Sequence, residues 1–91
     1  MVDNYELRFT DLALKDAHKI KRAGLEKKVQ QLLDVIRVNP YQTPPRYERL
    51  VGNLKGAYSR RINLKHRLVY SVDENEHFVR VLRMWSHYGD N

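Results

Sequence analysis

The chain has 91 residues, which suffice for one domain with a modest hydrophobic core but not for a second domain or an embedded cofactor fold. It contains no cysteine, which excludes disulfide scaffolds, thiol nucleophiles and the usual zinc sites, and it has no apolar run long enough to span a membrane. Its net charge of +6 favours a polyanionic partner such as nucleic acid. Because the N-terminus does not read as a secretory signal, we expect a cytoplasmic protein.

The first half of the chain predicts one strand followed by two helices. Hydrophobic and charged side chains alternate over residues 5–9, which is typical of a half-buried strand. Thr10 or Asp11 can cap a helix that Gly24 ends. Pro40 ends the next helix, because a proline disfavours helical backbone in the residue before it. The apolar stripe of this second helix consists of Leu25, Val29, Leu32, Leu33 and Ile36.

The second half predicts a sheet. After a stiff, proline-rich connection over residues 40–46, the composition shifts to β-branched and aromatic residues at hairpin spacing, with a polar turn over residues 73–76. The three predicted strands are residues 57–62, 66–72 and 78–85. The order of elements predicts an α+β fold in which an N-terminal strand and two helices pack on an antiparallel sheet (β-α-α-β-β-β). We expect one domain over residues 1–91.

Positive charge is concentrated in residues 46–67, where Glu48 is the only acidic residue. The seven cations of this segment are Arg46, Arg49, Lys55, Arg60, Arg61, Lys65 and Arg67. One interpretation is a merely soluble basic protein. Such an excess of cations around one carboxylate is more typical of a phosphate-binding surface than of a solvated face. We therefore predict that the phosphates of a nucleic acid are bound here, by Arg49, Arg60, Arg61 and Lys65.

Four blocks of sequence resemble the YoeB/Txe toxins of the RelE superfamily. The blocks are residues 47–50 (YERL), 58–62 (YSRRI), 66–70 (HRLVY) and 85–88 (WSHY). Each block alone is weakly specific, but the four occur in the family's order, and the predicted strand and helix pair precede them as they do there. The chain departs from many members in running on past the His-Tyr pair, through residues 89–91.

The resemblance implies a RelE-like fold and a function. Members of this family are ribosome-dependent mRNA endoribonucleases (mRNA interferases), toxins that inhibit translation and are held inactive by a YefM-type antitoxin. The implied partners are therefore that antitoxin, the 70S ribosome with its mRNA, and a second copy in a homodimer; no cofactor is implied. The resemblance carries catalytic roles to Glu48, Arg67, His87 and Tyr88, and a phosphate contact to Arg61.

These residue types suit RNA cleavage without a metal, which needs a base for the 2′-OH, an acid for the departing 5′-oxygen and a cation for the phosphate. Glu48 is suited to be the base. His87 is suited to be the acid, since histidine has an ordinary pKa of about 6.5. Arg67 and Arg61 suit the phosphate, because a guanidinium binds it through a planar, permanently charged fork. Tyr88 can position the phosphate or stack on a base.

Each assignment has a purely structural alternative. Glu48 can form a surface ion pair with Arg46 or Arg49, Arg67 can bridge two strands, and His87 can belong to a solvated tail. The remaining aromatic and histidine residues have structural interpretations only: Tyr58, Tyr70 and Trp85 in packing, His66 and His77 on the strand surface, and His18 on the helix surface. The histidines lack ligand spacing and clustered acids, so we predict no metal site.

Two other functions compete with the nuclease. The first is a non-nucleolytic toxin on the same scaffold, such as the ParE branch that poisons gyrase. That branch generally lacks the Glu48, Arg67 and His87-Tyr88 set. The second is a non-catalytic RNA-binding module, which needs the basic strands but neither a lone glutamate among cations nor a His-Tyr pair. The sequence therefore favours the nuclease.

Overall fold

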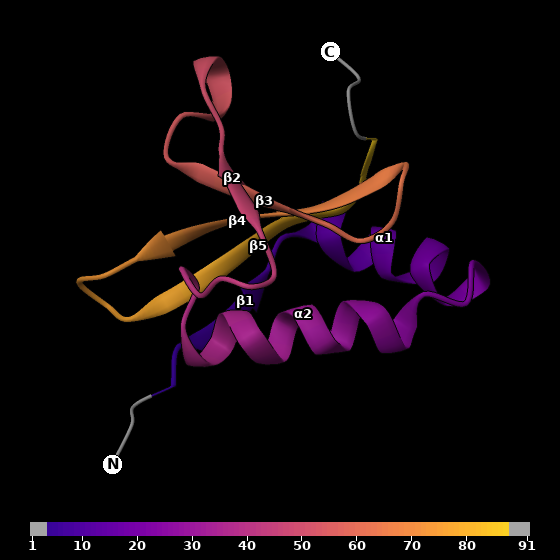
Figure 1. The fold of residues 1–91 in the computed structure, drawn as a ribbon, viewed down its shortest axis with the longest axis horizontal. Coiled ribbons are helices and arrows are strands. Elements are labelled where there is room, and N and C mark those ends of the chain that lie inside the picture. The colour runs from indigo at the N-terminus through magenta and orange to yellow at the C-terminus, as the bar shows by residue number, and fades with distance from the viewer. Residues whose placement is uncertain (1–3, 88–91) are drawn as a thin grey trace.

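The computed structural model describes residues 4–87, with His87 described through its backbone alone. Two helices pack on one five-stranded sheet (Figure 1). The elements in chain order are β1 (Glu6–Phe9), α1 (Asp11–Arg22), α2 (Glu26–Val38), β2 (Tyr47–Arg49), the 3-10 helix η1 (Gly52–Leu54), β3 (Ala57–Arg61), β4 (His66–Asp73) and β5 (Phe78–His87). The α+β class and the strand–helix–helix start predicted from the sequence are confirmed.

Local signals in the sequence set the helix boundaries. The Thr10 hydroxyl accepts a hydrogen bond from the Ala13 N–H at 3.1 Å and donates one to the Leu82 carbonyl at 2.8 Å. Thr10 therefore caps α1 and also ties its start to β5. Gly24 follows α1 with a φ of +72°, a left-handed conformation that glycine adopts without strain. The predicted cap at Thr10 and the predicted end of this helix at Gly24 are thus confirmed.

The sheet has the strand order β1-β5-β4-β3-β2. Strands β2 to β5 pair antiparallel, but β1 lies parallel to β5, with Glu6 opposite Phe78. The sheet is therefore mixed rather than wholly antiparallel. It also has one more strand than predicted, because β2 has only three residues, two of them charged, and this is too short for an alternating pattern to show.

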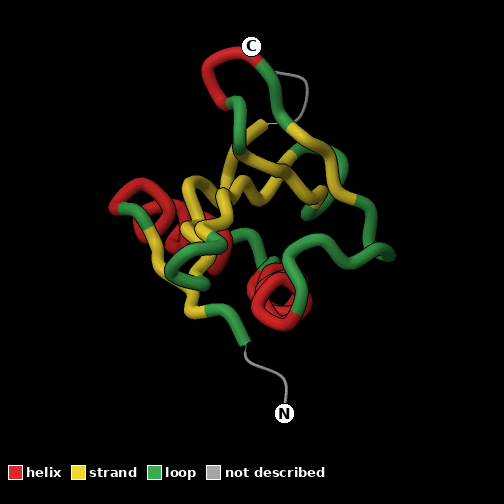
Figure 2. The backbone as a smooth tube through the Cα atoms, turned by 90° about the vertical axis from the view of Figure 1, so that its left-hand side faces the viewer, coloured by secondary structure: helices red, strands yellow, loops and turns green. Residues whose placement is uncertain are grey.

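The core fills the space between the helices and one face of the sheet. Figure 2 shows α2 nearly end-on below the strands. The stripe of α2 packs there with Ala13 and Ile20 of α1, and Leu68, Tyr70, Val79 and Val81 supply the sheet side of the core. The loop that carries η1 projects away from the helices, at the top of Figure 1. Among residues 4–87, no helix combines the length and apolar character needed to cross a bilayer.

A buried carboxylate joins α1 to β5. The Asp16 side chain, 3% exposed, accepts hydrogen bonds from Arg83 Nε at 2.8 Å and from the Met84 N–H at 2.9 Å. Burial by itself would raise the pKa of Asp16, but the hydrogen bonds from Arg83 and Met84 outweigh it and lower that pKa. The pairing of β4 with β5 shifts register on both sides of the Val69–Arg83 pair, so this contact holds β5 where its pairing with β4 is irregular.

We predict that Asp16→Asn lowers the free energy of unfolding at pH 7 by about 1–2 kcal/mol, because the amide keeps an acceptor for Met84 but loses the charged pair with the partly exposed Arg83. An exposed Asp has a pKa of about 3.9. Since the folded-state pKa of Asp16 is lower, its stabilising effect is present above pH 4 and disappears as the pH falls through the folded value. Urea unfolding at several pH values measures both effects.

The matched control is Asp34→Asn, at an exposed position of α2, which should change stability by less than about 0.5 kcal/mol. A loss in Asp16→Asn that does not shrink in acid would show that the charge of Asp16 does not stabilise the fold.

Candidate functional site

A cleft of about 330 Å³ lies where the proline-rich connection meets β2 and β3, and its lining includes both a carboxylate and a guanidinium of the predicted site. It is lined by Pro45, Arg46, Glu48, Ser59 and Arg61. Glu48 of β2 lies directly opposite Ser59 of β3. Directly opposed residues share one face of a sheet, and Arg61, two residues after Ser59, shares that face as well. Glu48 and Arg61 are therefore brought to one cleft by strand pairing.

Arg67 lies on the neighbouring strand. It is the register partner of Arg61 across β3 and β4, and its side chain is half-buried. Opposed side chains on antiparallel strands have Cβ atoms about 4.5–5.5 Å apart, and like charges in that arrangement destabilise the sheet. The sheet therefore holds two guanidinium-bearing residues side by side next to the cleft, an arrangement that favours the binding of an anion.

The end of β5 adjoins the same part of β4. Ser86 is opposite Arg67, and the backbone of His87 is opposite His66. The backbone of His87, the predicted acid, thus follows Ser86, the residue opposite Arg67, by one position. The side chain of His87 and the whole of Tyr88 lie outside what the structure describes, so both remain predictions.

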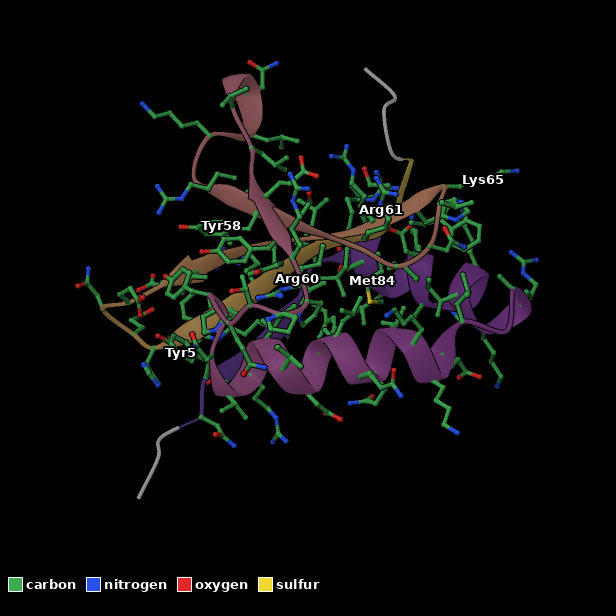
Figure 3. All side chains as sticks on the ribbon, in the orientation of Figure 1. Tyr5, Tyr58, Arg60, Arg61, Lys65 and Met84 are labelled. Carbon is green, nitrogen blue, oxygen red and sulfur yellow. The ribbon has the colours of Figure 1, made fainter. Side chains whose placement is uncertain are left out.

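Arg60 has a different role from the one predicted. Its side chain is 1% exposed, and its guanidinium donates to the carbonyl oxygens of Pro45 at 2.6 Å and Pro40 at 3.0 Å. In Figure 3, Arg60 lies on the side of the sheet that faces α2, whereas Arg61 lies on the other side. A buried guanidinium committed to backbone carbonyls is not available to RNA. We therefore correct the assignment and remove Arg60 from the phosphate-binding set.

Arg60 instead positions one wall of the cleft. Tyr70 assists it: its hydroxyl accepts from Arg60 Nε at 3.1 Å and donates to the Pro40 carbonyl at 2.7 Å. Burial raises the pKa of Tyr70, although the neighbouring Arg60 opposes that shift, so the phenol stays protonated and able to donate. Because Pro45 lines the cleft, the bond from Arg60 to its carbonyl ties the cleft wall to the sheet.

The other two predicted phosphate contacts lie elsewhere. Arg49 is exposed on β2 and opposite Tyr58, so it is on the other face of the hairpin from Glu48. Lys65 is exposed in the turn before β4, where Asn63 Oδ1 accepts from the Lys65 N–H at 2.9 Å. Neither residue lines the Glu48 cleft. The cations that appear contiguous in the sequence are thus divided over several surfaces.

Sequence reasoning missed several features around the cleft. Ser59 and Pro45 line the cleft, and neither was predicted. Ser59 could have been found, because it lies two residues before Arg61 and therefore on the same face of the strand. His66 is not on the strand surface as predicted: it is 8% exposed and stacks on Trp85 with ring centroids 3.7 Å apart. His77 lies in the turn before β5, with a φ of 60°, rather than in a strand.

In the described part of the chain, no three histidine or carboxylate residues gather into a group that fits a metal ion.

The fold and sequence match known proteins. Residues 9–88 match the family described as the YoeB-like toxin of bacterial type II toxin-antitoxin systems. The toxin YoeB of Escherichia coli K12 is 37% identical over 57 residues, which are 63% of this chain and 68% of the relative. A YoeB/ParE toxin from Agrobacterium tumefaciens has a TM-score of 0.82 at 28% identity, covering 91% of this chain and 99% of that one.

Staphylococcus aureus YoeB has been solved both in a YoeB–YefM complex and as a dimer. These structures have TM-scores of 0.76 and 0.78 at 34% and 33% identity, and each covers 92% of this chain and 98% of its own. The two-helix, mixed-sheet architecture is that of RelE-superfamily toxins. Within that superfamily the chain belongs to the YoeB-like toxins of type II toxin–antitoxin systems.

We predict that Arg60→Met lowers the free energy of unfolding by about 2 kcal/mol or more, because the Pro45 carbonyl then lacks its buried donor. Amide hydrogen exchange over residues 41–50 should also become faster, since the cleft wall is no longer tied to the sheet. Arg61→Met, the same substitution one residue later at an exposed position, is the matched control and should change stability by no more than about 0.5 kcal/mol. Equal effects of the two substitutions would contradict the positioning role.

Proposed function

We propose that this toxin is a ribosome-dependent mRNA endoribonuclease whose reacting groups are protein side chains. The observation that carries the proposal is the shared cleft of Glu48 and Arg61, in which a carboxylate lies beside a guanidinium suited to bind phosphate. A volume of about 330 Å³ is at the lower end of the range for small-molecule pockets, and is of a size to take part of a nucleotide. Membership of the YoeB family supports the same activity.

The proposed reaction is an internal transesterification. Glu48 accepts the proton of the ribose 2′-OH, and the 2′-oxygen attacks the adjacent phosphorus. The bond from phosphorus to the 5′-oxygen breaks, and His87 donates a proton to that oxygen. The products are a 2′,3′-cyclic phosphate and a free 5′-OH, so protons and charge balance without an external reactant.

The two opposed arginines stabilise the extra charge that develops on the phosphate. Arg61 approaches it from the cleft, and Arg67 from the adjoining strand. Placing two cations opposite each other weakens the sheet, and a phosphate bound to both reduces that repulsion. The benefit is largest in the transition state, where the phosphate carries the most charge. Tyr88 is proposed to hold the phosphate or stack on a neighbouring base.

The proposed partners follow from the shape and charge of the cleft. Its volume of about 330 Å³ takes only part of a nucleotide, so the 70S ribosome is proposed to hold the mRNA in line for attack. A YefM-type antitoxin, the partner of Staphylococcus aureus YoeB, is proposed to inhibit this chain through a segment that covers the cationic cleft. The dimer of that same relative is the basis for proposing a homodimer here.

We predict that Glu48→Gln slows single-turnover cleavage of ribosome-bound mRNA by about 10²–10⁴-fold, because the amide cannot accept the 2′-OH proton. The affinity for the ribosome should stay the same or increase, because the substitution removes a negative charge from a cationic cleft. His87→Gln should slow cleavage by a similar factor, and Arg61→Ala should weaken both cleavage and binding. Rates and ribosome affinity are measured separately for each variant.

The matched control is Glu76→Gln, which removes a carboxylate from the exposed turn before β5 and should cleave like the parent. Parental rates in both Glu48→Gln and His87→Gln would refute the acid–base assignment. A defect confined to Glu48→Gln would instead assign the proton donor to another residue, with Tyr88 the next to test.

We also predict that cleavage of ribosome-bound mRNA greatly exceeds cleavage of the same RNA free in solution. Positioning of reactants can contribute about 7–11 kcal/mol to a reaction of this kind, and the cleft alone does not supply it. Addition of EDTA, at concentrations that leave ribosomes intact, should not abolish cleavage. Equal rates on free and ribosome-bound RNA would refute the dependence on the ribosome.

A further inference from the structure

The β2–β3 hairpin carries a second hollow, of about 520 Å³, which differs in its lining from the Glu48 cleft. We call it the hairpin pocket. It is lined by Arg49, Leu50, Val51, Gly52, Lys55, Gly56, Ala57 and Tyr58. Both glycines have a positive φ, which lets the chain curl tightly between β2 and β3. The hydrogen bond from the Leu50 N–H to the Ala57 carbonyl, at 2.9 Å, closes the base of this curl.

Strand alternation directs the charged side chains of β2 to different hollows. Glu48 pairs with Ser59 and both line the cleft, whereas the adjacent pair, Arg49 and Tyr58, lines the hairpin pocket. Successive residues of a strand point to opposite faces, so the Arg49 and Tyr58 side chains are on the face of the hairpin opposite to Glu48 and Ser59. Because β2 is the edge strand of the sheet, no further strand lies beyond the hairpin on that side in the described structure.

The lining of the hairpin pocket combines positive charge with an aromatic ring. Arg49 and Lys55 are exposed, and no acidic residue is among the described residues that line the hollow. The Tyr58 ring is held by three other tyrosines: the rings of Tyr41 and Tyr47 meet it edge-on with centroids 5.7 Å away, and Tyr70 packs tilted against it. The ring is therefore oriented before any ligand arrives.

Cations beside a fixed aromatic ring are the arrangement with which proteins bind single-stranded nucleic acid, through backbone charge and base stacking. We propose that the hairpin pocket binds a nucleotide of single-stranded RNA away from the scissile phosphate, with phosphate on Arg49 and Lys55 and the base against Tyr58. The inference builds on the proposed ribonuclease function, because it gives that enzyme a second RNA-binding surface. It assigns Arg49 to this surface rather than to the reacting phosphate.

The experiment measures binding rather than cleavage, so it does not depend on whether the chain is a nuclease. The probe is a fluorescent, 2′-O-methylated oligonucleotide of about 12 nucleotides, which spans one single-strand site and cannot be cleaved through its 2′-oxygen. In the Arg49→Ala/Lys55→Ala double variant, affinity should fall about tenfold or more. The slope of log affinity against log salt should also become shallower, by about 0.7 for each phosphate that the variant no longer neutralises.

The control is Lys27→Ala/Lys28→Ala, which removes the same charge from exposed positions of α2 and should leave affinity nearly unchanged. Tyr58→Leu should weaken binding about fivefold or more, whereas Tyr58→Phe, which keeps the ring, should retain it. Thermal unfolding of each variant confirms that it is folded at the assay temperature. Equal losses of affinity in the two charge-removing variants would overturn the proposal, because they would reflect net charge alone.

A poly-glutamate peptide tests whether the hairpin pocket binds an acidic protein segment instead of nucleic acid. We expect it to bind more weakly than the oligonucleotide, since it has no base to stack on Tyr58. Tight binding of the peptide through Arg49 and Lys55, together with no effect of Tyr58→Leu on the oligonucleotide, would overturn the proposal in favour of an acidic protein segment.

Discussion

The buried guanidinium of Arg60 makes the hydrogen bonds on which the arrangement of the cleft depends. A buried cation must be compensated, and here the carbonyls of Pro40 and Pro45 and the hydroxyl of Tyr70 do so. These bonds fix the two ends of the proline-rich connection against β3 and β4. Since the connection leads directly into β2, they also determine where the chain enters that strand. The position of Glu48 beside Arg61 follows from that entry point and from the β2–β3 register.

Alternation along β2 and β3 then distributes the charges. Successive residues of each strand face opposite sides, so one side receives Glu48, Ser59 and Arg61, and the other receives Arg49 and Tyr58. Arg60 shares the second side but lies where the connection covers the sheet, and is buried. The cations of residues 46–67, which look like one group in the sequence, are therefore divided in the structure. Some line the candidate reaction cleft, others line the hairpin pocket, and Arg60 is buried.

The far side of the cleft depends on residues distant in sequence. Arg67 is opposite Arg61 on one edge of β4 and opposite Ser86 on the other. The end of β5 is held in turn by Asp16 of α1, which binds both the Arg83 side chain and the Met84 backbone. Through Asp16, α1 thus holds the strand end beside Arg67, although neither α1 nor α2 lines the cleft. Arg61 and Arg67 have like charges at opposed positions of the sheet, and a phosphate bound to both is proposed to offset their repulsion.

Elements with local signals could be predicted from the sequence. The Thr10 cap, the stop at Gly24, the apolar stripe of α2 and the three long strands depend on neighbouring residues, and motif order was enough to identify the family. Glu48 and Arg61 were also named as site residues from those motifs, and their catalytic roles remain a proposal. Tertiary structure alone decided the parallel pairing of β1, the short strand β2, the burial of Arg60 and His66, and the assignment of Arg49 to a different pocket from Glu48. Each of these depends on which distant segment lies against the residue, and hydrophobic periodicity along the chain contains no information about that neighbour.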